Sequence, residues 1–160
     1  MKAFYKLLFG LLFAYTLTGC IGEDYDVGVP TAHLQFENSF LSSVQLTEAN
    51  ISWETASEDV QKSIKDIEKY AASLDEIMVF PGQKTYLDFE ENEKNGGDIW
   101  TDPQVSAVLL KDDEEIEIVI GTFGEFQFPT DKGRYVLEVK FISTAGSAQY
   151  VGNIVIGKVD

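Results

Sequence analysis

The sequence predicts a mainly β protein, an antiparallel β-sandwich to which one amphipathic helix is added. Three observations lead to this fold class. Apolar residues make up 44% and aromatic residues 12% of the 160 residues, which is enough for a sizeable core. In the second half of the chain, short segments of alternating apolar and polar residues recur at intervals of about ten residues. Only one segment, about 57–74, has the periodicity of an amphipathic helix.

The first 19 residues differ from the rest of the chain. They contain Lys2 and Lys6 but no acidic residue, and residues 7–15 form an apolar stretch of the length found in secretory signal peptides. A membrane-spanning helix needs roughly 20 apolar residues, so this stretch is too short for one. We therefore expect residues 1–19 to be an export signal.

The expected export signal leads into Leu17-Thr18-Gly19-Cys20, which resembles the lipobox of bacterial lipoproteins. The resemblance covers residues 1–20. It implies cleavage between Gly19 and Cys20 and attachment of a diacylglyceryl group to the thiol of Cys20. Two acyl chains suffice for stable anchoring. The resemblance thus implies a lipid-anchored protein on the extracytoplasmic face of the cell membrane, or at the outer membrane in a bacterium with two membranes.

Cys20 is the only cysteine in the chain. Once acylated, it leaves no thiol for disulfides, thiol catalysis or a cysteine metal site. Residues 20–31 are expected to comprise the lipidated Cys20 and a flexible tether, since residues 21–31 are acidic, contain glycines and include Pro30, which disfavours a helix before it. At about 3.3 Å per residue, the eleven residues 21–31 would reach roughly 36 Å. Residues 32–160 are then expected to form a single domain.

The charge of the chain limits its partners. The chain has 12 basic and 27 acidic residues, a net charge of −15; without residues 1–19 the balance is 10 against 27, or −17. Such a chain is repelled by nucleic-acid phosphates and by anionic lipid surfaces, so we expect no nucleic-acid partner. Its charge favours metal cations or basic partners, although acidity by itself most often marks a solvated surface.

The predicted helix is an insertion between two groups of strands. Its apolar residues are spaced by 4, 3, 4 and 3 positions and form one stripe: Val60, Ile64, Ile67, Ala71 and Leu74. Thr55 and Glu58 fit a capping box at its start. We expect the stripe to pack on a sheet, with a site for a partner helix as the alternative.

Strands are predicted on both sides of this helix. Two precede it, at 33–36 and 44–53. Seven follow it, at 77–80, 84–89, 105–111, 115–121, 125–128, 134–142 and 148–157. Asp112 to Glu114 are expected to form the turn of a hairpin, and the acidic run at 112–117 to protect a sheet edge against aggregation.

Asp131, Gly133 and Tyr135 form a D-x-G-x-Y pattern at the start of the second-last predicted strand. This pattern resembles the tyrosine corner of immunoglobulin-like domains, and the resemblance covers about residues 77–160. It implies an immunoglobulin-like β-sandwich in which the Tyr135 hydroxyl bonds back to the upstream backbone. The paired cysteines of antibody domains are absent, so only the wider immunoglobulin-like class is implied.

Sequence patterns for catalysis are lacking. His33 is the only histidine, and the chain contains no G-x-S-x-G, HExxH, P-loop or G-x-G-x-x-G pattern. One histidine and no free cysteine also disfavour zinc. We therefore expect a protein that is not an enzyme. A hydrolase using two carboxylates remains an alternative, since spacing alone cannot place two acids in a cleft.

Acidic residues are concentrated in the segment 88–102. Six carboxylates are the candidate metal ligands, with calcium as the expected ion if any is bound: Asp88, Glu90, Glu91, Glu93, Asp98 and Asp102. Their spacing does not match an EF-hand loop, and a solvated connection between strands is the favoured interpretation. A calcium-dependent adhesion or stabilising module is the alternative, and no other cofactor is expected.

Four aromatic residues are candidates for an interaction surface: Trp100, Phe123, Phe126 and Phe128. Phe126 and Phe128 would share one face of a strand, and a bulge at Gly124 would bring Phe123 to the same face. Core packing is the favoured interpretation for all four, and an exposed interaction surface the other. With the predicted anchor, the sequence favours a non-catalytic binding role towards an envelope protein or polymer.

Overall fold

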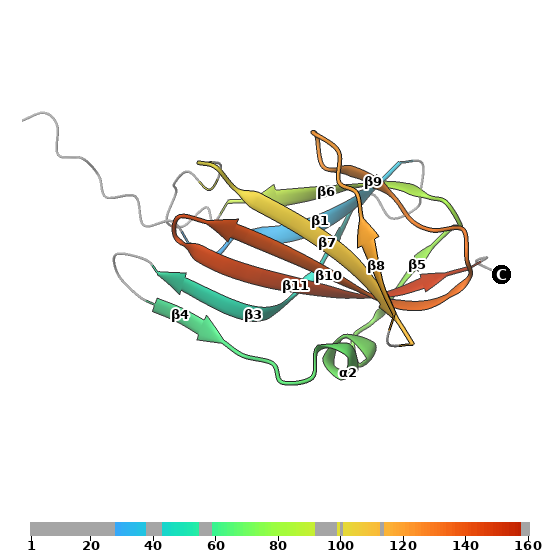
Figure 1. Cartoon of the computed structure of the whole chain (residues 1–160), viewed down its shortest axis with the longest axis horizontal. Coiled ribbons are helices and arrows are strands. Elements are labelled where there is room, and N and C mark those ends of the chain that lie inside the picture. The colour runs from blue at the N-terminus through green and yellow to red at the C-terminus, as the bar shows by residue number, and fades with distance from the viewer. Residues whose placement is uncertain are drawn as a thin grey trace, which may run out of the picture.

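Two β-sheets packed face to face make up the folded part of the chain (Figure 1). The computed structural model describes residues 28–37, 43–54, 59–91, 99, 101–112 and 114–157. One sheet, here called sheet A, has the strand order β2-β1-β6-β9. Its strands are β1 (Thr31–Phe36), β2 (Ser43–Gln45), β6 (Lys84–Glu90) and β9 (Glu125–Gln127).

The other sheet, sheet B, has seven strands in the order β4-β3-β11-β10-β7-β8, with β5 also paired to β11. These strands are β3 (Thr47–Glu54), β4 (Asp59–Lys62), β5 (Glu76–Val79), β7 (Gln104–Lys111), β8 (Glu114–Ile118), β10 (Gly133–Ser143) and β11 (Gly146–Ile156). All pairings between strands are antiparallel except that of β5 with β11. The predicted mainly β sandwich is therefore confirmed.

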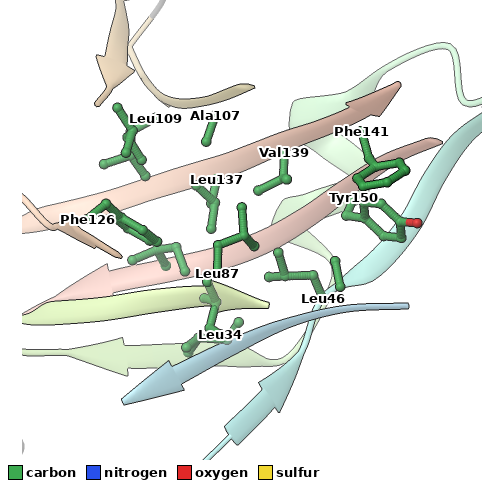
Figure 2. Packing of buried hydrophobic residues seen from close by; sticks show 14 of the residues in the cluster. Leu34, Leu46, Leu87, Ala107, Leu109, Phe126, Leu137, Val139, Phe141 and Tyr150 are labelled. Atoms are coloured by element: carbon green, nitrogen blue, oxygen red, sulfur yellow. The ribbon is translucent and has the colours of Figure 1, made fainter. Parts of the chain in front are cut away.

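Successive side chains of a strand point to opposite faces of its sheet. The side chains that point toward the other sheet form the core between the two. In β10, four alternate side chains are buried: Tyr135, Leu137, Val139 and Phe141. Figure 2 shows Leu34 and Leu87 of sheet A pointing toward Leu137 of sheet B. The rings of Phe89 and Phe141, one from each sheet, have centroids 4.7 Å apart. Burial of each large apolar side chain stabilises the sandwich by roughly 1.5–3 kcal/mol.

The helix predicted over 57–74 is wrong in extent. Residues 59–62 form β4, which pairs with β3, and only α2 (Ile67–Ala72) is helical. Asp66 sets the start of α2, since its backbone is extended and its side chain accepts a hydrogen bond from the Lys69 amide at 3.0 Å. The free edge of β3 gives residues 59–62 a ladder of hydrogen bonds that a short exposed helix would not match. Thr55 and Glu58, the predicted capping box, lie outside the described residues.

The apolar stripe nevertheless packs on a sheet. Ile64, Ile67 and Leu74 lie against a small cluster of Ala49, Ala71 and Val151 that is separate from the main core. This cluster places α2 on the face of sheet B that points away from sheet A. The Asn153 amide also donates to the Leu74 carbonyl at 3.0 Å, which fastens the end of α2 to β11.

Most predicted strands differ from the structure by only one or two residues at an end, but two differ by more. The single strand expected over 44–53 is divided at Leu46 into β2 and β3, which belong to different sheets. Leu46 is buried, and its amide donates to the Ala32 carbonyl at 2.8 Å, so the chain crosses between the sheets there. The strand expected over 115–121 ends as β8 at Ile118. The predicted hairpin between β7 and β8 is present, with Lys111 opposite Glu114.

The folded part begins inside the segment expected to be tether. Gly28 and Pro30 are buried, and the Tyr150 hydroxyl donates a hydrogen bond to the Pro30 carbonyl at 2.5 Å. Residues 28–31 therefore belong to the sandwich. Residues 1–27, with the predicted export signal and Cys20, lie outside the described residues. Within the described ranges, no helix is long and apolar enough to cross a membrane.

Near the start of β10, the Tyr135 hydroxyl donates to the Asp131 carbonyl at 3.0 Å. Gly133 between them has φ +153°, and the Lys111 ammonium lies 5.0 Å from the centre of the Tyr135 ring. A cation over an aromatic face adds to the attraction. These contacts hold the connection that leads into β10 against the end of β7.

Candidate interaction site

The connection between β8 and β9, residues 119–124, crosses from sheet B to sheet A (Figure 1). Its backbone is held by hydrogen bonds within a tight turn. The Gly121 amide donates to the Glu125 carbonyl at 2.8 Å, and the Gly124 amide donates to the Gly121 carbonyl at 3.1 Å. The Glu125 carboxylate accepts from the Phe123 amide at 2.9 Å. The Leu87 amide donates to the Gly124 carbonyl at 2.9 Å, which fastens the turn to β6.

Glycine is required at position 124. Its φ is +81°, and a Cβ there would lie 2.3 Å from the Leu87 carbonyl oxygen. A larger residue would push the turn away from β6. The close approach of the backbones therefore depends on the absence of a side chain.

This turn presents apolar side chains to solvent. Phe123 is 84% exposed and Val119 is 85% exposed, well above the other exposed large apolar residues of the described chain, of which Phe80 at 49% comes next. The turn backbone is tied at four hydrogen bonds while the Phe123 ring points outward. The hydrogen-bonded turn therefore fixes the position from which the Phe123 ring extends into solvent.

A groove of about 390 Å³ runs between this turn and the adjacent strand ends. The Phe123 groove, as we call it, has six apolar lining residues: Leu87, Phe89, Pro103, Val105, Ile120 and Phe123. Asp88 is the one charged side chain among the described residues that line it. The groove exists because β9 is short and pairs with β6 only as far as Tyr86, which leaves the rest of that edge without an adjoining strand in the described chain.

The structure separates the three phenylalanines predicted to act together. Phe126 and Phe128 are 5% and 2% exposed, and their rings contact edge to face with centroids 5.1 Å apart. They are core residues and are not available as an interaction surface. The expected bulge at Gly124 does not bring Phe123 to their face, because Phe123 lies in the turn before β9. Trp100 lies outside the described residues.

The predicted carboxylate ligands are spread along the surface where they are described. Asp88 accepts a hydrogen bond from the Gln35 amide at 2.7 Å, and Glu91 and Asp102 are exposed. The described ranges contain no group of three or more side chains that could hold a metal ion. Glu93 and Asp98 lie outside those ranges, so calcium binding stays a prediction.

His33 lies on the outer face of sheet A. Its Nε2 is 3.0 Å from the Thr31 hydroxyl and 3.7 Å from a Glu90 carboxylate oxygen. A threonine and a carboxylate partner are ordinary surface contacts for a histidine on a strand. The surroundings of His33 offer no arrangement for nucleophilic catalysis among the residues that the structure describes.

Sequence reasoning missed a row of polar contacts on the outer face of sheet B. The Gln149 amide donates to Glu138 at 2.8 Å, and the Asn50 amide donates to Gln149 at 2.6 Å. The Asn50 oxygen accepts from the Ile64 amide at 2.6 Å. This row joins β10, β11 and β3 to the segment before α2. Strand alternation places these side chains outward, but only the pairing of the strands aligns them.

Comparisons with protein-family models, with curated proteins and with solved structures yielded no match to this chain. The apolar walls, one carboxylate and exposed ring of the Phe123 groove suit non-covalent binding of an apolar group.

Proposed function

We propose that this protein is a bacterial lipoprotein, held on the extracytoplasmic face of a membrane by acylated Cys20, that binds an envelope partner without catalysis. The observation that carries the binding role is the exposure of Phe123 beside an apolar groove. A single exposed apolar side chain is ordinary on a protein surface, whereas a contiguous apolar patch marks an interaction site or a binding groove. Phe123 belongs to such a patch because it lines the groove with Leu87, Phe89, Pro103, Val105 and Ile120. Aromatic anchors of this kind contribute most of the affinity in many interfaces.

The lipobox supports the anchor. Since the sandwich already includes residue 28, only residues 21–27 are left between Cys20 and the described domain to serve as the expected tether. At about 3.3 Å per residue, it would hold the domain within roughly 23 Å of the lipid. An anchored domain this close to the bilayer meets partners in or near the membrane.

The strand order supports the resemblance to the wider immunoglobulin-like class. Strands β11, β10, β7 and β8 lie side by side opposite β6 and β9, which corresponds to the order of the last and middle strands in variable-type immunoglobulin domains. The hydrogen bond from Tyr135 to Asp131 supports the same resemblance. Domains of this class commonly serve as binding scaffolds, so the fold favours a binding role by analogy only.

The anchor is tested by growing cells with a fatty acid that carries a clickable tag. The intact chain should incorporate the tag and fractionate with membranes, and Cys20→Ala should do neither. An untagged intact chain would refute the anchor.

The binding role is tested separately by cross-linking in intact cells, with Phe123→Ser compared with Phe80→Ser. Both substitutions remove an exposed ring, but only the first removes the ring that lines the groove. Cross-linked products should disappear only with Phe123→Ser. Products that both variants keep would refute the role of the groove.

A further inference from the structure

We propose that the Phe123 groove binds a cationic protein segment, one that places an aliphatic or aromatic side chain against Phe123 and basic side chains over an acidic rim. The proposal rests on the binding role proposed above and names the class of partner. It is carried by the apolar lining of the groove together with the distribution of charge around it.

The lining supplies the anchor point. Phe89 and Leu87 are 6% exposed and form the floor of the groove, while Phe123 stands beside them with most of its ring in solvent. An incoming apolar side chain would cover the Phe123 ring and contact Val105 and Pro103, which also line the groove. A groove of about 390 Å³ is large enough for one or two such side chains, but it is small for a folded surface. This favours a protruding segment of the partner.

The rim supplies the charge. Asp88 lines the groove, and two exposed acids are next in sequence to lining residues: Asp102 precedes Pro103, and Glu125 follows Gly124. None of the described residues that line the groove is basic. The described basic residues are all absent from this lining: Lys62, Lys65, Lys69, Lys84, Lys111, Lys132, Arg134 and Lys140. Apolar contact in the centre with acids around it is complementary to an apolar side chain flanked by lysine or arginine.

The same charge argues against two other occupants. A second copy of this chain brings the same net charge, −15 in full and −17 without residues 1–19, so association of two grooves would place like charges together. A bilayer rich in anionic lipid would be repelled in the same way. Of these three occupants, only a basic protein segment with an apolar side chain is complementary to both the apolar lining and the acidic rim.

The test uses the full-length protein and four labelled synthetic peptides of equal length, with binding followed by fluorescence anisotropy. Three peptides share a leucine–phenylalanine centre and differ in their flanks, which are lysine and arginine, glutamine, or glutamate. The fourth combines basic flanks with a serine centre. We expect the basic peptide with the apolar centre to bind most tightly, and we expect added salt to weaken its binding.

Substitutions then locate the binding. Phe123→Ser should weaken the binding of the peptide with basic flanks and an apolar centre about thirtyfold, the loss typical of an interface anchor. Phe80→Ser, which removes another exposed phenylalanine, should leave binding unchanged. Asp102→Asn should weaken the binding of the apolar-centred peptide with basic flanks but not that of the glutamine-flanked peptide, because Asp102 acts only through charge. Circular dichroism of each variant confirms that it is folded.

Different failures refute different statements. Phe123-dependent binding that is equally tight for the glutamine- or glutamate-flanked peptide would overturn the partner class and keep the binding role. The partner class would also fall if Phe123→Ser abolished binding to anionic phosphatidylglycerol vesicles or self-association in sedimentation. If no peptide, vesicle or second copy binds in a way that depends on Phe123, both the partner class and the binding role of the groove are wrong.

Discussion

The substitution Tyr150→Phe removes a single hydroxyl from the interior of the sandwich. Tyr150 is 0% exposed, and its ring lies 6.0 Å from that of Phe89, centroid to centroid. Its hydroxyl donates to the Pro30 carbonyl at 2.5 Å, the contact that joins the start of the domain to β11. Phenylalanine keeps the ring and its packing, so the substitution tests this hydrogen bond alone.

The expected loss at neutral pH follows from the burial of the acceptor. A buried carbonyl that loses its donor costs about 1–3 kcal/mol, since no water replaces the lost partner. We expect Tyr150→Phe to lower the free energy of unfolding by that amount. A smaller loss would mean that water reaches the Pro30 carbonyl once the hydroxyl is gone.

The loss should depend on pH in one direction. Burial, together with the charge of Glu48, raises the pKa of Tyr150 in the folded state. The unfolded tyrosine ionises near its ordinary pKa of about 10, whereas the folded one keeps its proton. The stability from this group is therefore complete below pH ~10 and falls above it, by up to about 1.4 kcal/mol per pH unit. The phenylalanine variant lacks this decline, so the difference between the two proteins should shrink at alkaline pH.

Urea unfolding at pH ~7 and pH ~10.5, followed by circular dichroism, measures both effects. Hydrogen exchange adds a local readout, because amides at the start of β1 should exchange faster in the variant. Tyr135→Phe is the matched control, since its hydroxyl is only partly buried and bonds far from Pro30. Equal stability of Tyr150→Phe and the parent at neutral pH, or a difference that grows at alkaline pH, would refute the reasoning.

Three further substitutions or additions test other parts of the structure. Gly146→Ala should lower the free energy of unfolding by more than about 2 kcal/mol in urea titrations, because φ is +148° and a Cβ would lie 2.2 Å from the Ser52 carbonyl oxygen. Unchanged stability would show that the turn can shift. Asp66→Ala should cost about 1 kcal/mol in the same assay through loss of the cap on the Lys69 amide, and Asp66→Asn should restore most of it. Calcium added in excess of chelator should leave the thermal melt unchanged if the acids of 88–102 are solvated, whereas a higher melting temperature would favour the calcium-dependent alternative.

Several strands were predictable because they bury alternate residues. In 134–142, alternation reports directly which side chains face the other sheet. In 148–157 the alternation is interrupted, because β11 is buried on both faces from Tyr150 to Ile154 where α2 and its cluster cover the outer one. Pairing partners were not predictable in this way. The segment 44–53 has one continuous pattern, yet it divides at Leu46 and contributes to both sheets. Alternation describes the two faces of a strand and contains no information about which strand lies beside it.

The helix shows how a long-range contact overrides a local pattern. Val60 fits the helical stripe, but it also fits a strand, and in the structure it pairs with Trp53 at the edge of sheet B. A helix over 57–74 would depend on tertiary packing for most of its stability. The available edge of β3 therefore decides the conformation of residues 59–62. The part of the stripe that remains helical is the part that has Ala49 and Val151 to pack against.

The candidate site depends on the backbone conformation of the turn at Gly124, which the spacing of residues in the sequence does not predict. Phe123, Phe126 and Phe128 look alike in the sequence, and only the turn at Gly124 places the first in solvent and the others in the core. The same turn bonds to Leu87, which lies opposite Leu34 in β1.

The position of the groove along β6 relates it to the proposed anchor. Thr31, where β1 begins, lies opposite Glu90, one residue beyond the part of β6 that lines the groove. The start of β1 and the groove therefore lie near the same end of β6. If Cys20 is acylated as proposed, a tether of residues 21–27 keeps this end of the domain within roughly 23 Å of the lipid. A cationic segment that reaches the groove must then approach close to the membrane, where a partner that is itself membrane-bound encounters it most often.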